Sequence, residues 1–503
     1  MADSADHRRS PRLLFLHLLF TLLLPPCSPR TLPHAASSAV LEVVASLRRA
    51  AAVLSFNPEK SDQLLDQTKV GTVAASNSSA LSIKLHSRDF LPLAVAAGHK
   101  DYRGLTLARL RRDSARVLSI SARASLAVHG VKKSDLKPIV TDREVAAVGT
   151  ISGPVISGTS QGSGEYFSEV GIGQPAKPAF LVIDTGSDVT WIQCQPCTDC
   201  YQQSDPVYDP SSSSTYSPLP CDSQSCRSLD VSACRSSSCV YQVSYGDGSF
   251  TVGDFATDSL TFGSSSPVPS IALGCGHDNE GLFAGSSGIL GLGGGALSFP
   301  SQIRSAFFSY CLVNRDSPSS STLDFRPGTP DPGSVTASLL RNSKISTFYY
   351  VGLTGISVGG QPLSIPPSTF AMDESGAGGV IVDSGTAVTR LPREAYEALR
   401  DAFAKGTSDL PAAEGVALFD TCYDLSSMPS VEVPTVALRF DGGKELKLTA
   451  SNYLVPVDSL GTFCLAFAPT SSPLSIIGNV QLQETRVAFD LDKALVVFTP
   501  HSC

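Results

Sequence analysis

The strongest constraint on this chain is a short segment that occurs twice, once in each half of the sequence. Val182–Thr190 reads VIDTGSDVT, and Ile381–Thr389 reads IVDSGTAVT. Downstream of each copy an apolar pair precedes a glycine, at Ile289–Gly291 and at Ile476–Gly478. Two separate matches in the same order indicate a duplicated unit, so we expect two similar lobes within one chain.

The composition and the short apolar runs around both copies are typical of a β protein. A length of 503 residues exceeds one ordinary core, and 41 Gly and 34 Pro with only 17% charged residues favour strands and turns. One short helix is expected at Arg393–Ala404, and a Pro/Ser-rich stretch, Asn314–Ser334, is a candidate junction. Expected strands include Tyr166–Ile172, Ala179–Ile183, Val240–Tyr245, Tyr349–Val358 and Gly379–Val382. We therefore predict an all-β fold of two lobes.

The first residues are typical of a secretory signal. A basic stretch precedes an apolar run, Leu13–Leu24, that ends at two prolines. The run is too short to span a bilayer comfortably, and no later stretch is apolar enough, so we expect no stable membrane anchor. We assign residues 1–30 to a signal peptide. The expected destination is the secretory pathway, first the extracellular space (apoplast), with the vacuole and endoplasmic reticulum as alternatives.

The two aspartates of the repeat are the candidate catalytic groups. A lone Asp-Thr-Gly is usually an ordinary turn, but here each copy follows an apolar strand and each continues with hydroxyl residues. A pseudo-twofold axis between the lobes would bring Asp184 and Asp383 face to face. Two carboxyls that close share one proton, so one can activate a water while the other donates to a carbonyl. Neither group needs a metal or cofactor.

Each copy supplies three supporting residues after its aspartate. We expect the first hydroxyl to bond across the two loops, the glycine to permit a tight turn and close approach, and the second hydroxyl to hold the outer carboxylate oxygen. In order, these residues are Thr185, Gly186 and Ser187 in the first copy and Ser384, Gly385 and Thr386 in the second.

These motifs resemble the pepsin-type (A1) aspartic proteases, and within them the plant nepenthesin-like group and its guard-cell type. The resemblance covers about residues 160–503. It implies a bilobal fold with a cleft, and peptide-bond hydrolysis at acidic pH with inhibition by pepstatin-like compounds. The segment Val243–Ser249 matches the family's flap, which implies Tyr245, Gly246 and Asp247 over the substrate, with Trp191 as the partner of the tyrosine.

Charge divides the chain into a basic and an acidic part. Residues 1–150 contain 21 basic and 12 acidic side chains, a balance of +9, whereas the remainder contains 17 and 34, a balance of −17. The two parts are either ordinary solvated surfaces or a basic pro-segment that covers an acidic enzyme until carboxylates protonate. An acidic body argues against a nucleic-acid partner. Helical patterns at Ser38–Phe56 and at 104–128, with Arg109, Arg111, Arg112 and Arg116, lie in the basic part.

Cysteine usage fits export. Of 13 cysteines, Cys27 lies at the signal boundary, and an even set of twelve remains. The Cys194-x-x-Cys197-x-x-Cys200 spacing could also bind a metal, but bridging fits an oxidising compartment better. The family resemblance implies the pairs Cys194–Cys197, Cys200–Cys275, Cys221–Cys239, Cys226–Cys234, Cys311–Cys503 and Cys422–Cys464.

The expected organisation follows from these observations. It comprises the signal peptide, a pro-segment over 31–155, a first lobe over 156–335 with a Cys-rich insertion at 194–239, and a second lobe over 336–503. A sequon places a glycan at Asn77. We expect a monomeric endopeptidase that acts on polypeptides and binds its own pro-segment. The rival interpretation is a pepsin-fold binding or inhibitor protein that has lost catalysis.

Overall fold

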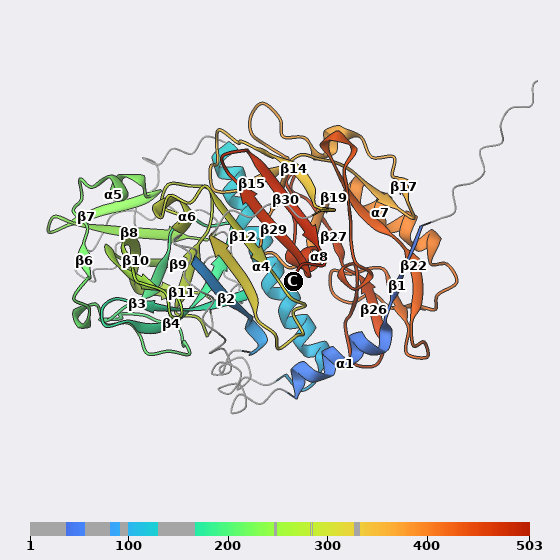
Figure 1. Ribbon diagram of the computed structural model, residues 1–503, viewed down its shortest axis with the longest axis horizontal. Helices are drawn as coiled ribbons and strands as arrows, with labels where there is room; N and C mark the ends of the chain where they lie inside the picture. Colours follow the sequence, from blue (N-terminus) through green and yellow to red (C-terminus); the bar gives the residue numbers. More distant parts are fainter. Residues whose placement is uncertain are drawn as a thin grey trace, which may run out of the picture. The chain divides into compact units, whose positions relative to one another are not determined.

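The computed structural model describes residues 37–55, 81–90, 99–128, 166–245, 249–281, 283, 285–325 and 332–503, which belong to one compact unit, Ala36–Cys503. The signal peptide (1–30), Asn77, the flap residues Gly246 and Asp247, and the boundary near residue 155 lie outside them. Strands predominate in the described ranges, so the expected all-β class is confirmed (Figure 1). No helix within those ranges is long and apolar enough to cross a bilayer.

The first lobe consists mainly of strands, one of which ends at Asp184. Its strand β4 is buried at Leu181, Val182 and Ile183 and ends at that aspartate. The elements are β3 (Tyr166–Ile172), β4 (Lys177–Asp184), β5 (Trp191–Gln193), η3 (Pro210–Ser212), β6 (Ser217–Pro218), α5 (Gln224–Ser228), β7 (Val231–Arg235), β8 (Ser238–Ser244), β9 (Phe250–Thr261), β10 (Val268–Glu280), β11 (Gly288–Gly291), α6 (Phe299–Gln302), β12 (Phe307–Cys311) and β13 (Ser321–Phe325).

The second lobe repeats this plan around Asp383. The expected helix at 393–404 is present as α7, while the expected strand at 349–358 is two strands, β15 and β16. The elements are β14 (Val335–Leu340), β15 (Tyr349–Val351), β16 (Leu353–Val358), β17 (Gln361–Pro362), η4 (Pro367–Phe370), β18 (Val380–Val382), β19 (Thr389–Pro392), α7 (Arg393–Gly406), β20 (Ala412–Ala413), β21 (Cys422–Asp424), β22 (Val431–Pro434), β23 (Val436–Phe440), η5 (Asp441–Gly443), β24 (Glu445–Lys447), η6 (Ala450–Asn452), β25 (Leu454–Pro456), β26 (Thr462–Leu465), β27 (Phe467–Thr470), β28 (Ser475–Ile477), α8 (Asn479–Leu482), β29 (Thr485–Asp490) and β30 (Leu495–Pro500).

The two halves of each repeat lie side by side in the fold. In the first lobe β4 pairs in parallel with β11, and the Cα of Asp184 lies opposite that of Gly291. In the second lobe β18 pairs in parallel with β28, and Ile381 lies opposite Ile476. Each aspartate therefore follows a strand that is buried against the downstream apolar pair of its own copy. The duplication read from the sequence is a duplication of structure.

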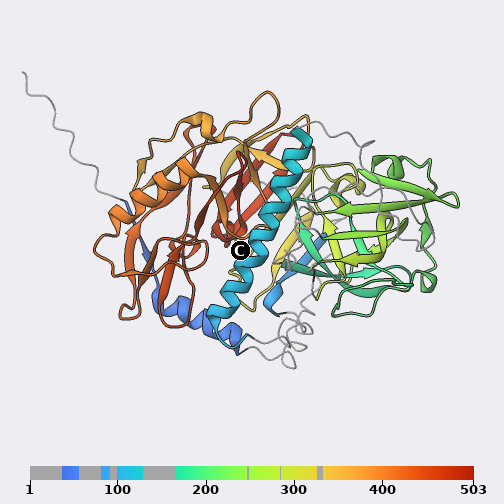
Figure 2. The ribbon, with the colours of Figure 1, turned by 180° about the vertical axis from the view of Figure 1, so that it is seen from behind.

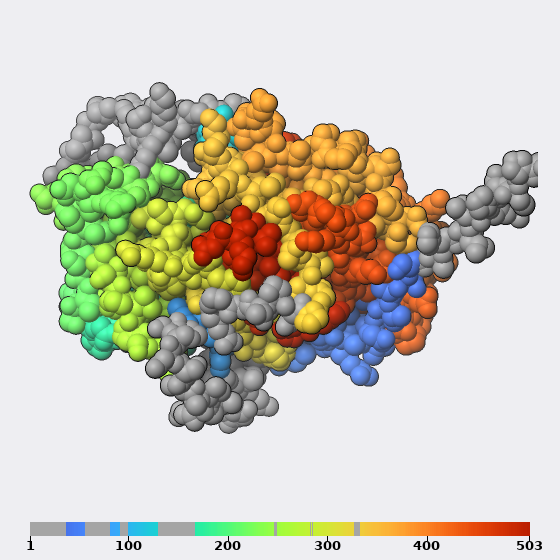
Figure 3. All heavy atoms as spheres, turned by 45° about the horizontal axis from the view of Figure 1, so that its top comes forward, coloured from blue at the N-terminus to red at the C-terminus, as the bar shows by residue number. Residues whose placement is uncertain are grey.

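A sheet that includes upstream residues connects the lobes. β2 (Leu81–Ser87) pairs with β13 and β3, β12 pairs with β29, and β14 pairs with β30. The sequence analysis did not predict β2, although its buried Ile83 and Leu85 alternate with exposed residues at the period of a strand. In Figure 3 the C-terminal end of the chain (red) lies at the surface between the lobes.

Two helices of the basic segment pack against the lobes. The helix expected over 38–56 is α1 (Val43–Leu54), and the prediction is wrong for the first residues, which form β1 (Ser38–Leu41) because they pair with β22. The second helix, expected at 104–128, is α4 (Tyr102–Val128). Figure 2 shows α4 (cyan) running between the green first lobe and the orange and red second lobe. A short 3-10 turn, η1 (Arg88–Phe90), follows β2.

Two of the expected disulfides are wrong near β5. The bridges are Cys194–Cys275 and Cys197–Cys200, in place of Cys194–Cys197 and Cys200–Cys275. β5 runs parallel to β10, and the backbone N–H of Cys194 donates to the carbonyl of Gly276 at 2.8 Å. That pairing brings the Cα atoms of Cys194 and Cys275 to 5.3 Å, within the range of a disulfide.

Two more are wrong in the Cys-rich insertion. The bridges are Cys221–Cys234 and Cys226–Cys239, in place of Cys221–Cys239 and Cys226–Cys234. Cys226 and Cys239 are both buried in one apolar cluster with Trp191, whereas Cys234 is exposed. Burial therefore sorts the pairs. The expected bridges Cys311–Cys503 and Cys422–Cys464 are present.

Candidate active site

Asp184 and Asp383 lie at equivalent places on two facing loops. Their exposed fractions are only 2% and 1%. A Cβ atom added to Gly186 would lie 3.0 Å from Asp383 Oδ1, and one added to Gly385 would lie 3.0 Å from Asp184 Oδ1. Each loop thus approaches the carboxylate of the other so closely that a side chain at either glycine would crowd it. The geometry brings the two carboxylates together.

The loops are joined by reciprocal hydrogen bonds. The backbone N–H of Ser384 donates to Thr185 Oγ1 at 2.9 Å, and the N–H of Thr185 donates to Ser384 Oγ at 3.3 Å. Asn479 Nδ2 also donates to the carbonyl of Ser384 at 2.8 Å. These buried contacts fix the separation of the two aspartates across the lobe boundary.

The second hydroxyls of the two copies differ in their hydrogen bonds. Thr386 Oγ1 donates to Asp383 Oδ2 at 2.6 Å, as its motif position suggests. Ser187 Oγ, expected to do the same for Asp184, is buried and has no hydrogen-bond partner among the described residues. The backbone N–H of Gly186 donates to Asp184 Oδ1 at 3.0 Å, as the equivalent N–H of Gly385 does to Asp383. The two loops share a sequence frame but hold their carboxylates differently.

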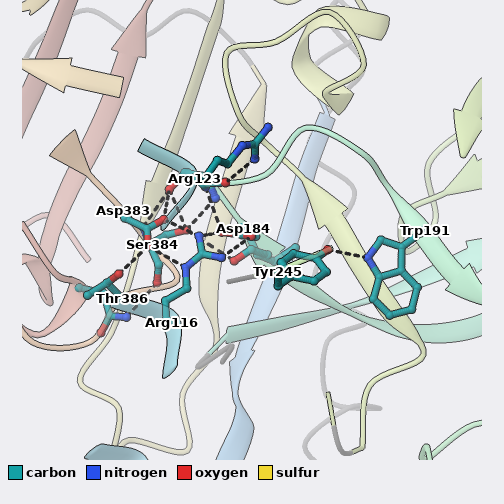
Figure 4. A network of polar contacts seen from close by, with 12 residues as sticks. Arg116, Arg123, Asp184, Trp191, Tyr245, Asp383, Ser384 and Thr386 are labelled. Atoms are coloured by element: carbon teal, nitrogen blue, oxygen red, sulfur yellow. Dashed lines mark hydrogen bonds and ion pairs between the residues drawn. The ribbon is translucent and has the colours of Figure 1, made fainter. Parts of the chain in front are cut away.

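A guanidinium from α4 lies between the two carboxylates. Arg116 Nη1 donates to Asp184 Oδ2 at 2.9 Å, and its Nε and Nη2 donate to the two oxygens of Asp383, each at 3.1 Å. Nη2 also contacts Asp184 Oδ1. Arg116 is only 4% exposed, so one buried arginine contacts all four carboxylate oxygens (Figure 4). The sequence analysis did not assign Arg116 to the site.

This arrangement shifts the protonation of the site. Burial by itself would raise the pKa of Asp383, but Arg116, Thr386 and the backbone N–H of Gly385 outweigh burial and hold the pKa below its usual value. Burial also opposes the charge of Arg116, yet the two aspartates raise its pKa. The guanidinium therefore favours the ionised form of Asp383. Among the described residues, no cluster of three or more His, Cys, Asp or Glu side chains could hold a metal ion.

Two further side chains of α4 bind the loops on either side of Arg116. Toward the second lobe, Asp113 accepts hydrogen bonds from the N–H groups of Ala387 at 2.6 Å and Val388 at 3.2 Å, and it pairs with Arg390. Toward the first lobe, Arg123 Nη1 donates to the carbonyl of Gly186 at 3.4 Å, and its Nη2 lies near Asp188 and Asp230. α4 therefore contacts both loops as well as both aspartates.

A buried ion cluster lies nearer the start of the same helix. Arg109 is fully enclosed, and its Nε donates to Asp89 Oδ2 at 2.7 Å while its Nη2 donates to Asp316 Oδ1 at 2.8 Å. The hydroxyl of Tyr102 donates to Asp316 at 2.7 Å. Arg109, Arg112, Arg116 and Arg123 are spaced by three, four and seven residues, which places them on one helical face. That spacing is the signal that could have indicated a contact surface.

Tyr245, the expected flap tyrosine, and Trp191 contact each other. Trp191 Nε1 donates to Tyr245 Oη at 2.9 Å, as Figure 4 shows. The ring of Phe283 packs edge-on against both rings, with centroid distances of 5.0 Å to Trp191 and 5.4 Å to Tyr245. Trp191 is completely buried, so the contact holds the end of β8 against the first-lobe core.

Comparison with protein families gives two consecutive matches. Residues 166–325 match the family described as Xylanase inhibitor N-terminal, and residues 348–500 match Xylanase inhibitor C-terminal. These ranges correspond to most of the two expected lobes. The family descriptions refer to inhibitors, so they do not by themselves separate catalytic members from non-catalytic ones.

Similar proteins of known sequence are plant aspartic proteases. Aspartyl protease family protein 2 of Arabidopsis thaliana is 48% identical over 90% of this chain and 92% of that protein. ASPARTIC PROTEASE IN GUARD CELL 2 of the same plant is 44% identical over 85% and 88%, and nepenthesin-1 of Nepenthes gracilis is 42% identical over 68% and 79%. The similarity to the first two extends into the basic segment upstream of the lobes.

Solved structures share the fold at low identity. The crystal structure of edgp superimposes with a TM-score of 0.53 and 23% identity over 68% of this chain and 92% of that one. Basic 7S globulin from soybean gives a TM-score of 0.53 and 21% identity over 67% and 93%. At these identities the likeness concerns the two-lobed β fold alone.

Proposed function

The chain belongs to the plant, nepenthesin-like group of pepsin-type aspartic proteases, and on that premise we propose that it is an aspartic endopeptidase with Asp184 and Asp383 as its catalytic pair. The observation that carries the proposal is the single guanidinium of Arg116, which contacts both carboxylates. Two groups that one guanidinium can reach are close enough to share a proton and to bind one water between them.

The proposed mechanism follows from this proximity. Once Arg116 has left, two facing carboxyls cannot both ionise easily, so one keeps a proton and the other is charged. The charged member takes a proton from the bound water, which attacks the carbonyl carbon of the peptide bond. The protonated member donates to the carbonyl oxygen, which gives a tetrahedral diol. When the diol collapses, the C–N bond breaks and the leaving amine takes the proton that the charged aspartate accepted from water. Thr185 and Ser384 keep the two loops in register, while Tyr245 with Trp191 covers the bound polypeptide.

We further propose that residues 31–155 are a pro-segment that keeps the enzyme inactive. Its helix α4 occupies the position where substrate must lie, and Arg116 neutralises both catalytic groups. The catalytic lobes are then 156–335 and 336–503. The disulfides are consistent with the secretory pathway, and the extracellular space is the proposed destination. We propose that the released enzyme is a monomer that pepstatin-like compounds inhibit.

Acidification would release the pro-segment. Because the pKa of Asp383 is lowered in the closed state, its contact with Arg116 favours that state above the usual aspartate pKa of about 4, and this contribution is lost as the pH falls through the lower value. Burial raises the pKa of Asp113, so this group binds its proton more readily in the closed state and opposes release. On acidification Asp383 therefore favours release, and Asp113 opposes it.

The alternative is a pepsin-fold protein that binds partners without catalysis, in the manner suggested by the family descriptions. The complete pair of aspartates with its hydroxyls and flap tyrosine favours the enzyme. The test is cleavage of a denatured protein by the processed chain at about pH 4, near the aspartate pKa, with and without pepstatin. Pepstatin-sensitive cleavage supports the proposal. A processed, folded chain that cleaves nothing would favour the binding protein.

A further inference from the structure

A second buried carboxylate contact lies beside the catalytic pair and has no part in the proposed chemistry. The side chain of Asp113 extends from α4 into the second lobe and is fully enclosed there. Its Oδ1 accepts two hydrogen bonds from the N–H groups of Ala387 and Val388, and its Oδ2 lies 2.5 Å from Arg390 Nη2. One guanidinium and two peptide N–H groups thus surround a single carboxylate, which is how proteins bind this group as a ligand.

All three donors lie outside the proposed pro-segment, whereas the carboxylate lies inside it. When α4 leaves, the donors remain and lose their partner. The side chain of Arg390 is only 5% exposed, and its other contact is the carbonyl of Val388 at 2.9 Å. Within the described ranges, Asp113 is the one carboxylate that forms an ion pair with Arg390. With α4 gone, the guanidinium and the two N–H groups face the vacated site without their acceptor, so this place favours another carboxylate.

The position of the donors relates them to the scissile bond. Ala387 directly follows Thr386, which holds the catalytic Asp383. Asp113 and Arg116 are three residues apart on α4, or about 4.5 Å along the helix axis. An extended peptide advances about 3.3 Å per residue. A substrate that replaces α4 would therefore bring a side chain one or two residues from the scissile bond to the place of Asp113.

The internal repeat supports the same placement. In the alignment of the two copies, Arg390 occupies the position of Trp191. Trp191 contacts the flap tyrosine on the first-lobe side, and Arg390 contacts α4 on the second-lobe side. The two lobes thus present an aromatic ring and a cation at equivalent places, which makes the two sides of the cleft chemically different.

We propose, on the basis of the proposed endopeptidase function, that Arg390 and the N–H groups of Ala387 and Val388 form a subsite for an Asp or Glu side chain of the substrate. Asp113 occupies this subsite until α4 leaves. Arg390 is then a residue that determines specificity, and the preferred substrates are polypeptides with an acidic residue within about two positions of the cleaved bond.

The test uses the processed chain and matched peptides with acetylated and amidated ends. The peptides carry Asp, Asn, Glu or Gln at each of the nearest positions on both sides of the cleaved bond. At one position, kcat/KM should favour the acid over its amide by about tenfold to a hundredfold, as expected for hydrogen bonds to a charged group. A second set with free C-termini shows whether a terminal carboxylate, rather than a side chain, is the group bound.

Substitutions at Arg390 identify the source of the preference. Arg390→Met should abolish it, so that kcat/KM becomes equal for the acid peptide and its matched amide. Arg393→Gln, at an exposed position on α7, is the matched control and should keep the preference. A preference that persists in Arg390→Met, or that requires a free C-terminus, would overturn the proposal.

A binding measurement keeps the proposal testable if Arg390→Met folds poorly or if peptides are not cleaved. A synthetic peptide of residues 102–128 is titrated onto the processed chain beside its Asp113→Asn version, and the conservative variant Arg390→Lys replaces Arg390→Met. Asparagine should weaken Kd about tenfold on wild type and less on Arg390→Lys. Equal Kd values on wild type would contradict the subsite. Cleavage of all peptides without preference rejects the subsite alone, whereas cleavage of none rejects the proposed protease.

Discussion

The two aspartate loops share a sequence frame and differ at the positions that surround it. After the hydroxyl, the first loop has Asp188 and then Trp191, whereas the second has Ala387 and then Arg390. The frame positions the carboxylates, and both loops do this with the same buried strand pairing. Duplication therefore accounts for the pair of aspartates, and later divergence of the two copies accounts for the different residues around them.

The charges on helix α4 are complementary to the different residues of the two loops. It presents the cation Arg123 to the loop that carries Asp188, and the anion Asp113 to the loop that carries Arg390. Arg116 lies between them on the shared pair. Opposite charges on the two sides of Arg116 fix the direction in which the helix crosses the site. A helix inserted in the reverse direction would place like charges together on both sides.

The largest expected effect tests whether the loops are equivalent in catalysis. In the processed chain, Asp184→Asn and Asp383→Asn should each lower kcat by about a thousandfold or more, because each removes one of two groups that exchange protons with the reactants. The measurement is kcat on one cleavable peptide. Asp230→Asn, at an exposed position, serves as the control and should match wild type. Activity within tenfold of wild type in either variant would exclude that aspartate from the pair.

The next effect tests whether Asp113 and Arg123 contribute unequally to the docking of α4. In the full chain, Asp113→Asn leaves Arg390 buried without a counter-charge, and docking of α4 should weaken by about 3 kcal/mol or more. Arg123 is 37% exposed, so Arg123→Gln should weaken docking by less than about 1 kcal/mol. Hydrogen exchange of the α4 amides at neutral pH measures both. Equal exchange rates in the two variants would show that Asp113 and Arg123 stabilise the docked helix to the same extent, which contradicts the prediction.

A smaller effect concerns the second hydroxyl of each copy. Thr386→Val removes a 2.6 Å hydrogen bond to a charged oxygen and should lower the free energy of unfolding of the full chain by about 1.5–3 kcal/mol. Ser187→Ala removes a hydroxyl with no described partner, so the change should stay within about 0.5 kcal/mol. Denaturant titration compares them. A larger loss of unfolding free energy for Ser187→Ala than for Thr386→Val would contradict the prediction that only the Thr386 hydroxyl stabilises its loop.

The smallest effect concerns the aromatic side of the cleft. Tyr245→Phe removes the acceptor of the Trp191 N–H, and kcat/KM of the processed chain should fall by about fivefold, which corresponds to one neutral hydrogen bond of about 1 kcal/mol. Tyr310→Phe is a suitable control because its buried hydroxyl has no partner among the described residues. Equal activity of Tyr245→Phe and wild type would mean that the contact does not order the flap.

The sequence predicted the parts of this account that rest on periodicity and repetition. The two aspartates, the apolar pair downstream of each, and the helix α4 could be read from the chain because each has a repeated or periodic pattern. The burial of Arg116 could not, since arginines on a helix usually face water and nothing in composition identifies which one is enclosed. Four of the six disulfide pairings that the family resemblance implied are wrong, and the spacing of the cysteines could not have corrected them because it does not determine which cysteine is buried.

The orphaned hydroxyl of Ser187 was missed for a different reason. The motif is symmetric, so equal roles were expected for Ser187 and Thr386. Arg116 contacts both oxygens of each aspartate, but of the two second hydroxyls only that of Thr386 also bonds its aspartate. The asymmetry therefore lies in the hydroxyls of the repeat itself.

The most direct test of the account compares the pH profile of the unprocessed chain with that of its Arg116→Gln variant. Activity on a quenched peptide is measured relative to the processed chain at each pH, with gel analysis to verify that the chains are intact. Wild type should be silent near neutral pH and become active only below about pH 4, as Asp383 protonates. Arg116→Gln leaves two facing carboxylates without a counter-charge, so it should be active well above that pH. Identical profiles would contradict the claim that α4 holds the pair inactive through Arg116.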